Sequence, residues 1–134
     1  MVAGLAFLAG CQHFDRAREC RALADGVNPE LKELSTVYGK RTPTSGDQYR
    51  DASKKYRAAA VRLGKLTFNE PELARLSQEL RDNLLGISRT CDRLAVTFDH
   101  PERPADVGAQ QELDAHRQRH ASLVSATDKF CQQP

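Results

Sequence analysis

Cys91, His116 and His120 are the residues whose types and spacing come closest to a metal site. The two histidines are four residues apart, so on a helix both imidazoles share one face, a common arrangement for a pair of metal ligands. Counting from the ends of the helices predicted below puts Cys91 at a height similar to that of His116, with Tyr56 near the same level. A thiolate with two imidazoles is a ligand set for zinc or copper.

A structural role for these residues is favoured over metal binding. A histidine on the apolar side of a helix is commonly exposed at the edge of that side, or hydrogen-bonded to a neighbour such as Tyr56. The chain lacks a His-Glu-x-x-His motif and a second carboxylate at ligand spacing. We therefore expect no bound cofactor, with a metal site of Cys91, His116 and His120 as the alternative.

Motifs of the common enzyme classes are missing from the sequence. It contains no Cys-x-x-Cys-His for covalent haem, no Gly-rich phosphate loop and no Gly-x-Ser-x-Gly turn. Carboxylates such as Glu79 and Asp82 are spaced as on a solvated helix surface. We predict that the protein is not an enzyme.

The composition predicts that helices position these side chains. The 134 residues suit one domain, there is no Trp, and Leu and Ala supply most of the apolar side chains. Leu, Ala, Arg, Glu and Gln favour helices, and runs of β-branched residues are missing. This composition indicates an all-α protein.

Apolar residues recur in steps of three and four along four segments, which places each set on one side of a helix. The first set is Ala17, Cys20, Ala24, Val27, Leu31, Leu34 and Tyr38. Gly26 and Asn28-Pro29 interrupt it without changing its phase, which favours one kinked rod ending near Gly39 and Pro43.

The other three helices also carry start and stop signals. Ser45 with Gln48 matches a capping box, Asn69 can cap the third helix, and the fourth begins near Asp106 after the break at His100-Pro101. Their apolar sets are Tyr49, Ala52, Tyr56, Ala59, Leu63 and Leu66; Leu73, Leu76, Leu80, Leu84, Ile87, Cys91, Leu94 and Phe98; and Ala109, Leu113, His116, His120, Leu123, Thr127 and Phe130. Short connections between four amphipathic helices predict an up-down antiparallel four-helix bundle.

The first residues form an apolar run that ends in a cysteine. Val2 to Gly10 carries no charge and is too short to span a bilayer, but it has the length of a signal-peptide core. It ends in Leu8-Ala9-Gly10-Cys11, which resembles the lipobox of bacterial lipoproteins. The resemblance covers about a dozen residues and implies cleavage before Cys11 and acylation of its thiol. A buried N-terminal helix with an incidental cysteine is the alternative.

This resemblance predicts the location of the protein. Residues 1–10 would be the signal peptide and residues 11–134 the single mature domain, lipid-anchored in the bacterial cell envelope. Gln12, in place of the Asp that commonly retains such proteins at the inner membrane, favours the outer membrane, facing the periplasm. Such signals begin with basic residues, whereas the first here is Arg16, so we expect the true start upstream or a truncated chain.

With Cys11 acylated, Cys20, Cys91 and Cys131 allow at most one internal disulfide. In the predicted bundle Cys20 and Cys131 lie at the same end, whereas Cys91 is displaced from Cys20 by roughly 20 Å along the axis. A disulfide needs Cα atoms within about 7 Å. We therefore predict a Cys20–Cys131 disulfide and a free, buried Cys91, with three reduced core cysteines as the alternative.

Charge is nearly balanced along the chain, with one local excess. The net charge of +2 does not suggest a nucleic-acid binder, but Lys40 to Lys65 holds eight Lys or Arg against Asp47 and Asp51. A solvated helix face is the favoured interpretation, and the alternative is an interaction patch of Lys54, Lys55 and Arg57 for an anionic partner.

Two functions fit a tethered helical bundle. The first is a structural or interaction protein that presents its faces to a protein partner in the cell envelope. The second is a ligand- or metal-binding module that uses the interior around Tyr56, Cys91, His116 and His120. A binding module needs a cavity with converging polar groups, whereas a scaffold has a filled core and an exposed patch.

Overall fold

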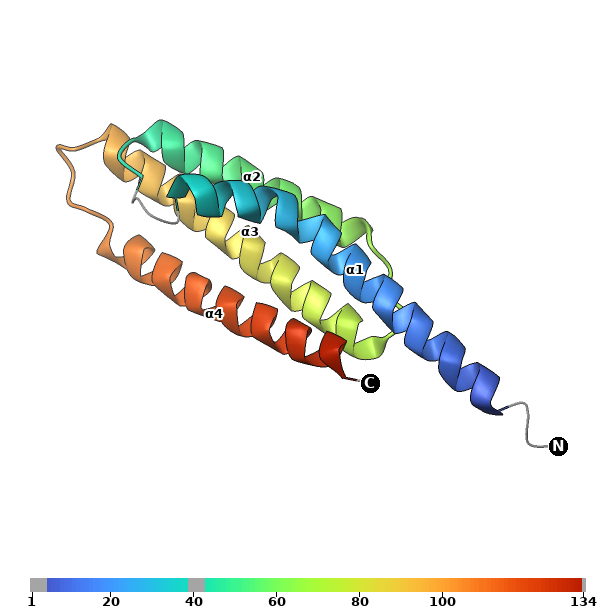
Figure 1. The fold of residues 1–134 in the computed structure, drawn as a ribbon. Coiled ribbons are helices and arrows are strands. Elements are labelled where there is room, and N and C mark those ends of the chain that lie inside the picture. The colour runs from blue at the N-terminus through green and yellow to red at the C-terminus, as the bar shows by residue number, and fades with distance from the viewer. Residues whose placement is uncertain (1–4, 39–42, 134) are drawn as a thin grey trace.

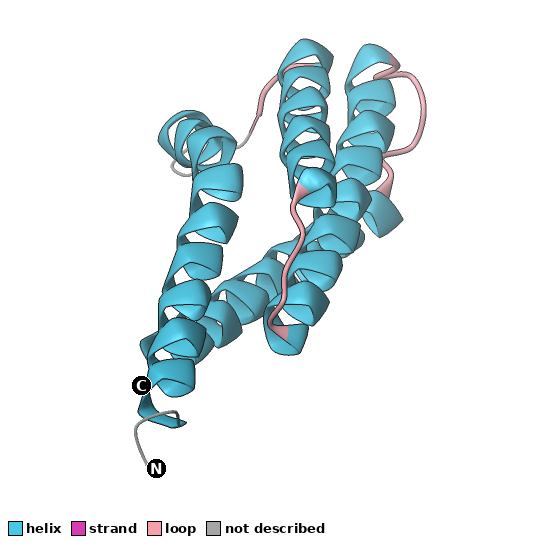
Figure 2. Cartoon of the chain, turned by 90° about the vertical axis from the view of Figure 1, so that its right-hand side faces the viewer, coloured by secondary structure: helices cyan, strands magenta, loops and turns pink. Residues whose placement is uncertain are grey.

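The protein is an antiparallel bundle of four helices, as its apolar periodicity predicts. In the computed structural model the helices are α1 (Leu5–Tyr38), α2 (Gly46–Lys65), α3 (Pro71–Asp99) and α4 (Val107–Gln132), joined by short loops (Figure 1). The structure describes the backbone of residues 5–38 and 43–133 and the side chains of residues 15–32 and 43–133. Within these ranges it contains helices and loops but no strand (Figure 2).

The four helices are packed unequally around α3. This helix packs along α2 on one side and along α4 on the other, whereas α1 lies mainly against α2 and contacts α3 and α4 sparsely. Because α3 is covered on two sides, it buries small polar side chains beside its leucines. These are Ser77, Asn83, Ser88 and Thr90.

The core consists of two apolar clusters, one at each end of the bundle. We call the end that holds the Cys20–Cys131 disulfide and the α2–α3 loop the base, and the opposite end the tip. The base cluster is built around Leu23, Val27, Leu63, Leu73, Leu76, Leu80, Leu84 and Leu123. The tip cluster is built around Tyr49, Ala52, Ile87, Cys91, Leu94, Ala109 and Leu113, and Leu31 and Tyr56 pack against both clusters.

The buried face of α1 differs from the predicted one. Glu19, Leu23 and Val27 are buried, whereas Ala17 and Ala24 are exposed. Val27 of the predicted set is buried, and Cys20 and Leu31 pack against the core, so among its described side chains only the two alanines fall outside the contact face. An alanine pattern alone does not say which side of a helix meets its neighbour. Leu23, which that set omitted, fills the base cluster instead.

Helix α1 continues without interruption through Pro29, so the rod predicted from its phase is one helix. Proline has no N–H, so the Asp25 carbonyl four residues earlier loses its usual donor. The neighbouring Gly26 carbonyl accepts a hydrogen bond of 3.1 Å from Nε of Arg62 on α2. The same guanidinium forms an ion pair with Glu30. Arg62 thus braces α1 where proline weakens it.

The predicted cap is confirmed at α2, the predicted start of α4 near Asp106 is confirmed, and the predicted cap of α3 is replaced. The Ser45 hydroxyl accepts from the Gln48 N–H and the Asp106 carboxylate accepts from the Ala109 N–H. The Gln48 side chain, however, accepts from the N–H of Thr44, one residue before the position that a capping box predicts.

Asn69 does not cap α3. Glu70 is the N-cap and makes no side-chain cap bond. The buried Glu19 carboxylate of α1 accepts hydrogen bonds from the backbone N–H groups of Asn69 at 2.6 Å and Glu70 at 3.1 Å. The start of α3 is therefore satisfied from another helix, which also fixes the height of α1 along the bundle.

Candidate functional site

An apolar groove lies between α1 and α4. It encloses about 260 Å³. Because α1 contacts α4 sparsely, the two helices leave a channel whose floor is formed by Leu23 and by Leu80 of α3. We call it the α1–α4 groove, and its lining is Cys20, Leu23, Ala24, Val27, Asn28 and Leu31 with Leu80, Val124, Thr127, Asp128 and Cys131.

The disulfide closes the groove at the base. Cys20 and Cys131 are bonded with their Cα atoms 6.1 Å apart, which confirms the predicted pairing, and both cysteines line the groove. Beside them the Arg16 guanidinium lies 4.7 Å from the ring centre of Phe130 and 3.8 Å from the Glu70 carboxylate. Together with the Glu19 cap, these contacts hold α1, α3 and α4 together at this end.

The tip end of the groove meets the tip cluster at Leu31. This side chain lines the groove and also packs against the tip cluster. Tyr56 packs against the same cluster. Cys91 is the free cysteine of the described side chains and is buried there, as predicted. Burial raises the pKa of the Cys91 thiol to about 11, so it is protonated at neutral pH.

Arg117 brings a positive charge to this same region from α4. Burial raises the pKa of Tyr49 and Tyr56, a buried neighbour thiol acts in the same direction, and the charge of Arg117 opposes both. It likewise opposes the rise at Cys91. No carboxylate among the described side chains lies within ion-pair distance of Arg117.

The predicted metal ligands are held apart by packing. The ring of His116 lies against Gly86, and its Nδ1 is 2.9 Å from Oδ1 of the buried Asn83, whose Nδ2 donates to the His116 carbonyl. His116 is thus fixed against α3 by Asn83 and Gly86.

His120 is placed one turn nearer the base and is half-buried. Its Nδ1 is buried without a hydrogen-bond partner among the described residues, and burial lowers the pKa of the ring, which favours the neutral form. Within the described ranges no three His, Cys, Asp or Glu side chains converge well enough to hold a metal ion. Cys91, His116 and His120 are therefore not brought together.

The predicted basic patch is largely paired. Lys55 forms an ion pair with Asp51 on its own helix and Arg57 with Asp92 of α3, while Lys54 is exposed. These pairs match the interpretation of a solvated helix face whose charges have partners nearby.

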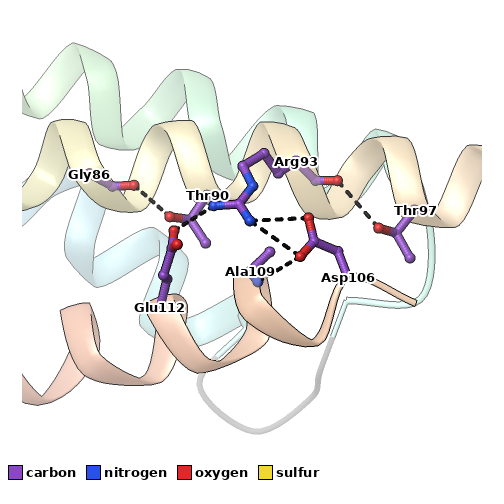
Figure 3. A network of polar contacts seen from close by, with 7 residues as sticks. All are labelled: Gly86, Thr90, Arg93, Thr97, Asp106, Ala109 and Glu112. Atoms are coloured by element: carbon purple, nitrogen blue, oxygen red, sulfur yellow. Dashed lines mark hydrogen bonds and ion pairs between the residues drawn. The ribbon is translucent and has the colours of Figure 1, made fainter. Parts of the chain in front are cut away.

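At the tip, Arg93 links α3 to the start of α4. Its guanidinium bonds both carboxylate oxygens of Asp106 at 3.2 Å and reaches Glu112 at 2.6 Å (Figure 3). Asp106 at the same time caps α4 through the Ala109 N–H. The network orders the turn at the tip and leaves Val96, Phe98 and Val107 exposed around it.

Sequence reasoning missed both the groove and Arg117. A groove arises from how far two helices stand apart, and the spacing of apolar residues within one helix does not report that distance. One signal was present: Arg117 is seven residues before Val124 and eleven before Asp128, so all three share one face of α4.

The segment Leu8-Ala9-Gly10-Cys11 lies at the start of α1, whose backbone is helical from Leu5 onward. The side chain of Cys11 lies outside the residues whose side chains the structure describes. None of the described helices is long and apolar enough to cross a membrane.

Comparison of the chain with models of protein families, with curated proteins and with solved structures finds no match in any of the three. Function is therefore inferred from the residues and the geometry of this chain.

Proposed function

We propose that the protein is a lipid-anchored interaction protein of the bacterial cell envelope, tethered through Cys11, with the helical bundle as its binding body. The observation that carries this proposal is Leu8-Ala9-Gly10-Cys11 directly after an uncharged apolar run. The Cys20–Cys131 disulfide supports it, because disulfides persist in exported proteins and are rare in the bacterial cytosol.

The geometry of the bundle suits a tether at Cys11. Cys11 is nine positions before Cys20, which is about 14 Å of helix at 1.5 Å per residue. The first turns of α1 project beyond the end of α4, so the tether and the C-terminus are at the same end of the bundle (Figure 1). The base would then face the membrane and the tip would be presented to a partner protein, with the outer membrane as the proposed site.

Metabolic labelling with a palmitate analogue tests the anchor. Wild-type protein expressed in a bacterium with its native start is expected to carry label, to fractionate with membranes and to have Cys11 as its N-terminus. The Cys11→Ser variant is expected to lose the label and the membrane fractionation, whereas Cys91→Ser keeps both. An unlabelled, membrane-free wild type would overturn the proposal.

The surface that meets the partner is addressed by comparing two sets of variants. Charge reversal of Lys54, Lys55 and Arg57 changes the side of α2, and Phe98→Asp changes the tip. Crosslinking in native membranes followed by mass spectrometry identifies the partner. Loss of its crosslink in only one set assigns the surface, and crosslinks unchanged in both sets count against these two surfaces.

A further inference from the structure

The α1–α4 groove has the form of a site for one extended apolar chain. Its lining on α1 runs from Cys20 to Leu31, eleven positions further on, which is about 16 Å of helix at 1.5 Å per residue. Its volume of about 260 Å³ lies just below the range of roughly 300 to 1,000 Å³ typical of small-molecule sites. A long and narrow site of this volume fits a single acyl chain better than a ring system.

The two ends of the groove differ in charge. Asp128 lines it near the disulfide. At the tip end Arg117 lies on the same face of α4 as Val124, two turns further on, without a carboxylate partner among the described side chains. At the base the Arg16 guanidinium is already paired with Glu70, so among the described side chains the unpaired charge that lines the groove there is the negative one of Asp128. An anionic group is therefore favoured at the tip end.

Hydrogen-bond donors are also present near Arg117. The hydroxyl groups of Tyr49 and Tyr56 have no hydrogen-bond partner among the described residues. Tyr49 belongs to the tip cluster, and Tyr56 packs against this cluster as Leu31 does. An unpaired guanidinium two turns from Val124 of the groove, with phenol hydroxyls in the adjoining tip cluster, is a combination that can recognise a carboxylate or phosphate on an acyl chain.

We propose that the α1–α4 groove binds a single-chain anionic lipid, with the tail towards the disulfide and the head group at Arg117. The chain buries its methylene groups against Leu23, Val27 and Val124, whose burial drives binding. The head group gains a charge-assisted contact with Arg117, which stays in contact with solvent. This site is independent of the acyl chains proposed on Cys11.

Isothermal titration calorimetry with laurate, below its critical micelle concentration, tests the site. The protein is the full chain with Cys11→Ser, so that no attached lipid can fill the groove. Saturable one-to-one binding is expected. Ala24→Phe, which puts a ring into the groove from an exposed position, is expected to reduce the affinity at least tenfold, whereas Ala58→Phe on the outer face of α2 leaves it unchanged.

If circular dichroism shows that Ala24→Phe does not fold, a second pair of variants tests the groove. Val124→Asp places a charge in the groove, and Val61→Asp places the same charge on an exposed face of α2. Only the first is expected to weaken laurate binding. Absence of saturable laurate binding, or equal binding by both members of a pair, overturns the site. Saturable binding of an amphipathic helical peptide by a protein that does not bind laurate would assign the groove to a peptide instead.

The head-group position is tested with 1-dodecanol, which has the same chain length without the charge. Arg117→Ala is expected to weaken laurate binding about tenfold and to leave dodecanol binding unchanged, while Arg89→Ala, at an exposed position on α3, changes neither. Equal effects of Arg117→Ala on both ligands would overturn the placement of the head group. Because these assays use Cys11→Ser protein, their outcome is separate from that of palmitate labelling.

Discussion

The buried Cys91 thiol is expected to react slowly with alkylating reagents. Only 3% of the residue is exposed, and burial raises the pKa of its thiol to about 11. The thiolate is the nucleophile, so at pH 8 the reactive fraction is very small. We expect iodoacetamide to alkylate Cys91 at least tenfold more slowly in the native protein than in urea, measured by mass spectrometry of the Cys91 peptide. Rapid alkylation at pH 8 without denaturant would contradict the burial described here.

The Glu19 carboxylate is expected to stabilise the protein by capping the start of α3. It accepts two hydrogen bonds from the start of α3, and bonds to a charged group contribute roughly 1.5 to 3 kcal/mol. We expect Glu19→Ala to lower the free energy of unfolding in urea by about 2 kcal/mol, and Glu19→Gln, which keeps one acceptor, by about half as much.

Glu102→Ala is the matched control for Glu19, because Glu102 is exposed in the α3–α4 loop and pairs only with His100 among the described residues. A change within about 0.5 kcal/mol is expected there. Equal losses for Glu19→Ala and Glu102→Ala would show that the cap contributes nothing. The sequence could not predict this cap, because Glu19 and Asn69 are fifty positions apart and only the packing of α1 on α3 brings them together.

Helix boundaries and most buried faces were predictable because they depend on local sequence. Ser45 caps α2, and α4 begins beside Asp106, as expected. The predicted apolar set of α3 is buried from Leu73 to Leu94, whereas its last member, Phe98, is exposed. The face of α1 was not predictable in the same way. Its alternating Ala and Leu positions fit two neighbouring stripes, and the choice depends on Leu23 and Glu19 meeting α2 and α3.

Gly86 sets how closely α4 approaches α3. A Cβ at this position would lie 2.5 Å from Cε1 of His116, whose ring is held by Asn83. We therefore expect Gly86→Ala to destabilise the protein by about 1 to 3 kcal/mol, although Ala is the better helix former. The measurement is the urea unfolding midpoint.

Gly108→Ala is the control for Gly86→Ala. A Cβ there would meet Oδ1 of Asp106 at 3.5 Å, an ordinary van der Waals contact, so this variant should gain up to about 1 kcal/mol of stability. His116→Ala removes the clashing ring, and in that background Gly86→Ala should cost less than in the wild type. An unchanged cost in both backgrounds would mean that His116 does not impose the glycine.

At the scale of the whole molecule, the disulfide joins residues 111 positions apart and encloses nearly the entire bundle. A loop of about this length is expected to contribute about 4 to 5 kcal/mol by restricting the unfolded chain. We expect reduction, or the pair Cys20→Ala with Cys131→Ala, to lower the free energy of unfolding by up to that amount. Cys91→Ala serves as the cysteine control, with a cost unaffected by reductant. Identical urea curves with and without reductant would contradict a structural role for the disulfide.

The overall arrangement of the bundle was predictable, but the opening between α1 and α4 was not. Four amphipathic helices with short loops restrict the topology to an up-down bundle, and that topology places Cys20 beside Cys131. How far α1 stands from α4 depends on which face α1 turns to α2, where Arg62 binds Gly26 and Glu30. A pattern along one helix holds no information about these cross-helix contacts.

The loops at the two ends of the bundle allow its orientation on a membrane to be predicted and measured. The α2–α3 loop lies at the base with the Cys11 end of α1, whereas the α3–α4 loop lies at the tip, and α3 between them has 29 residues, about 43 Å at 1.5 Å per residue. If Cys11 carries the anchor, a dye attached through Asn69→Cys should transfer energy to a membrane-bound acceptor much more efficiently than one attached through Glu102→Cys, both in a Cys91→Ser background. The two labelling positions are matched, because both new cysteines lie at exposed loop positions. Equal transfer from both sites would instead mean that the bundle lies flat on the membrane, and stronger transfer from Glu102→Cys would mean that the tip, and not the base, faces the lipid.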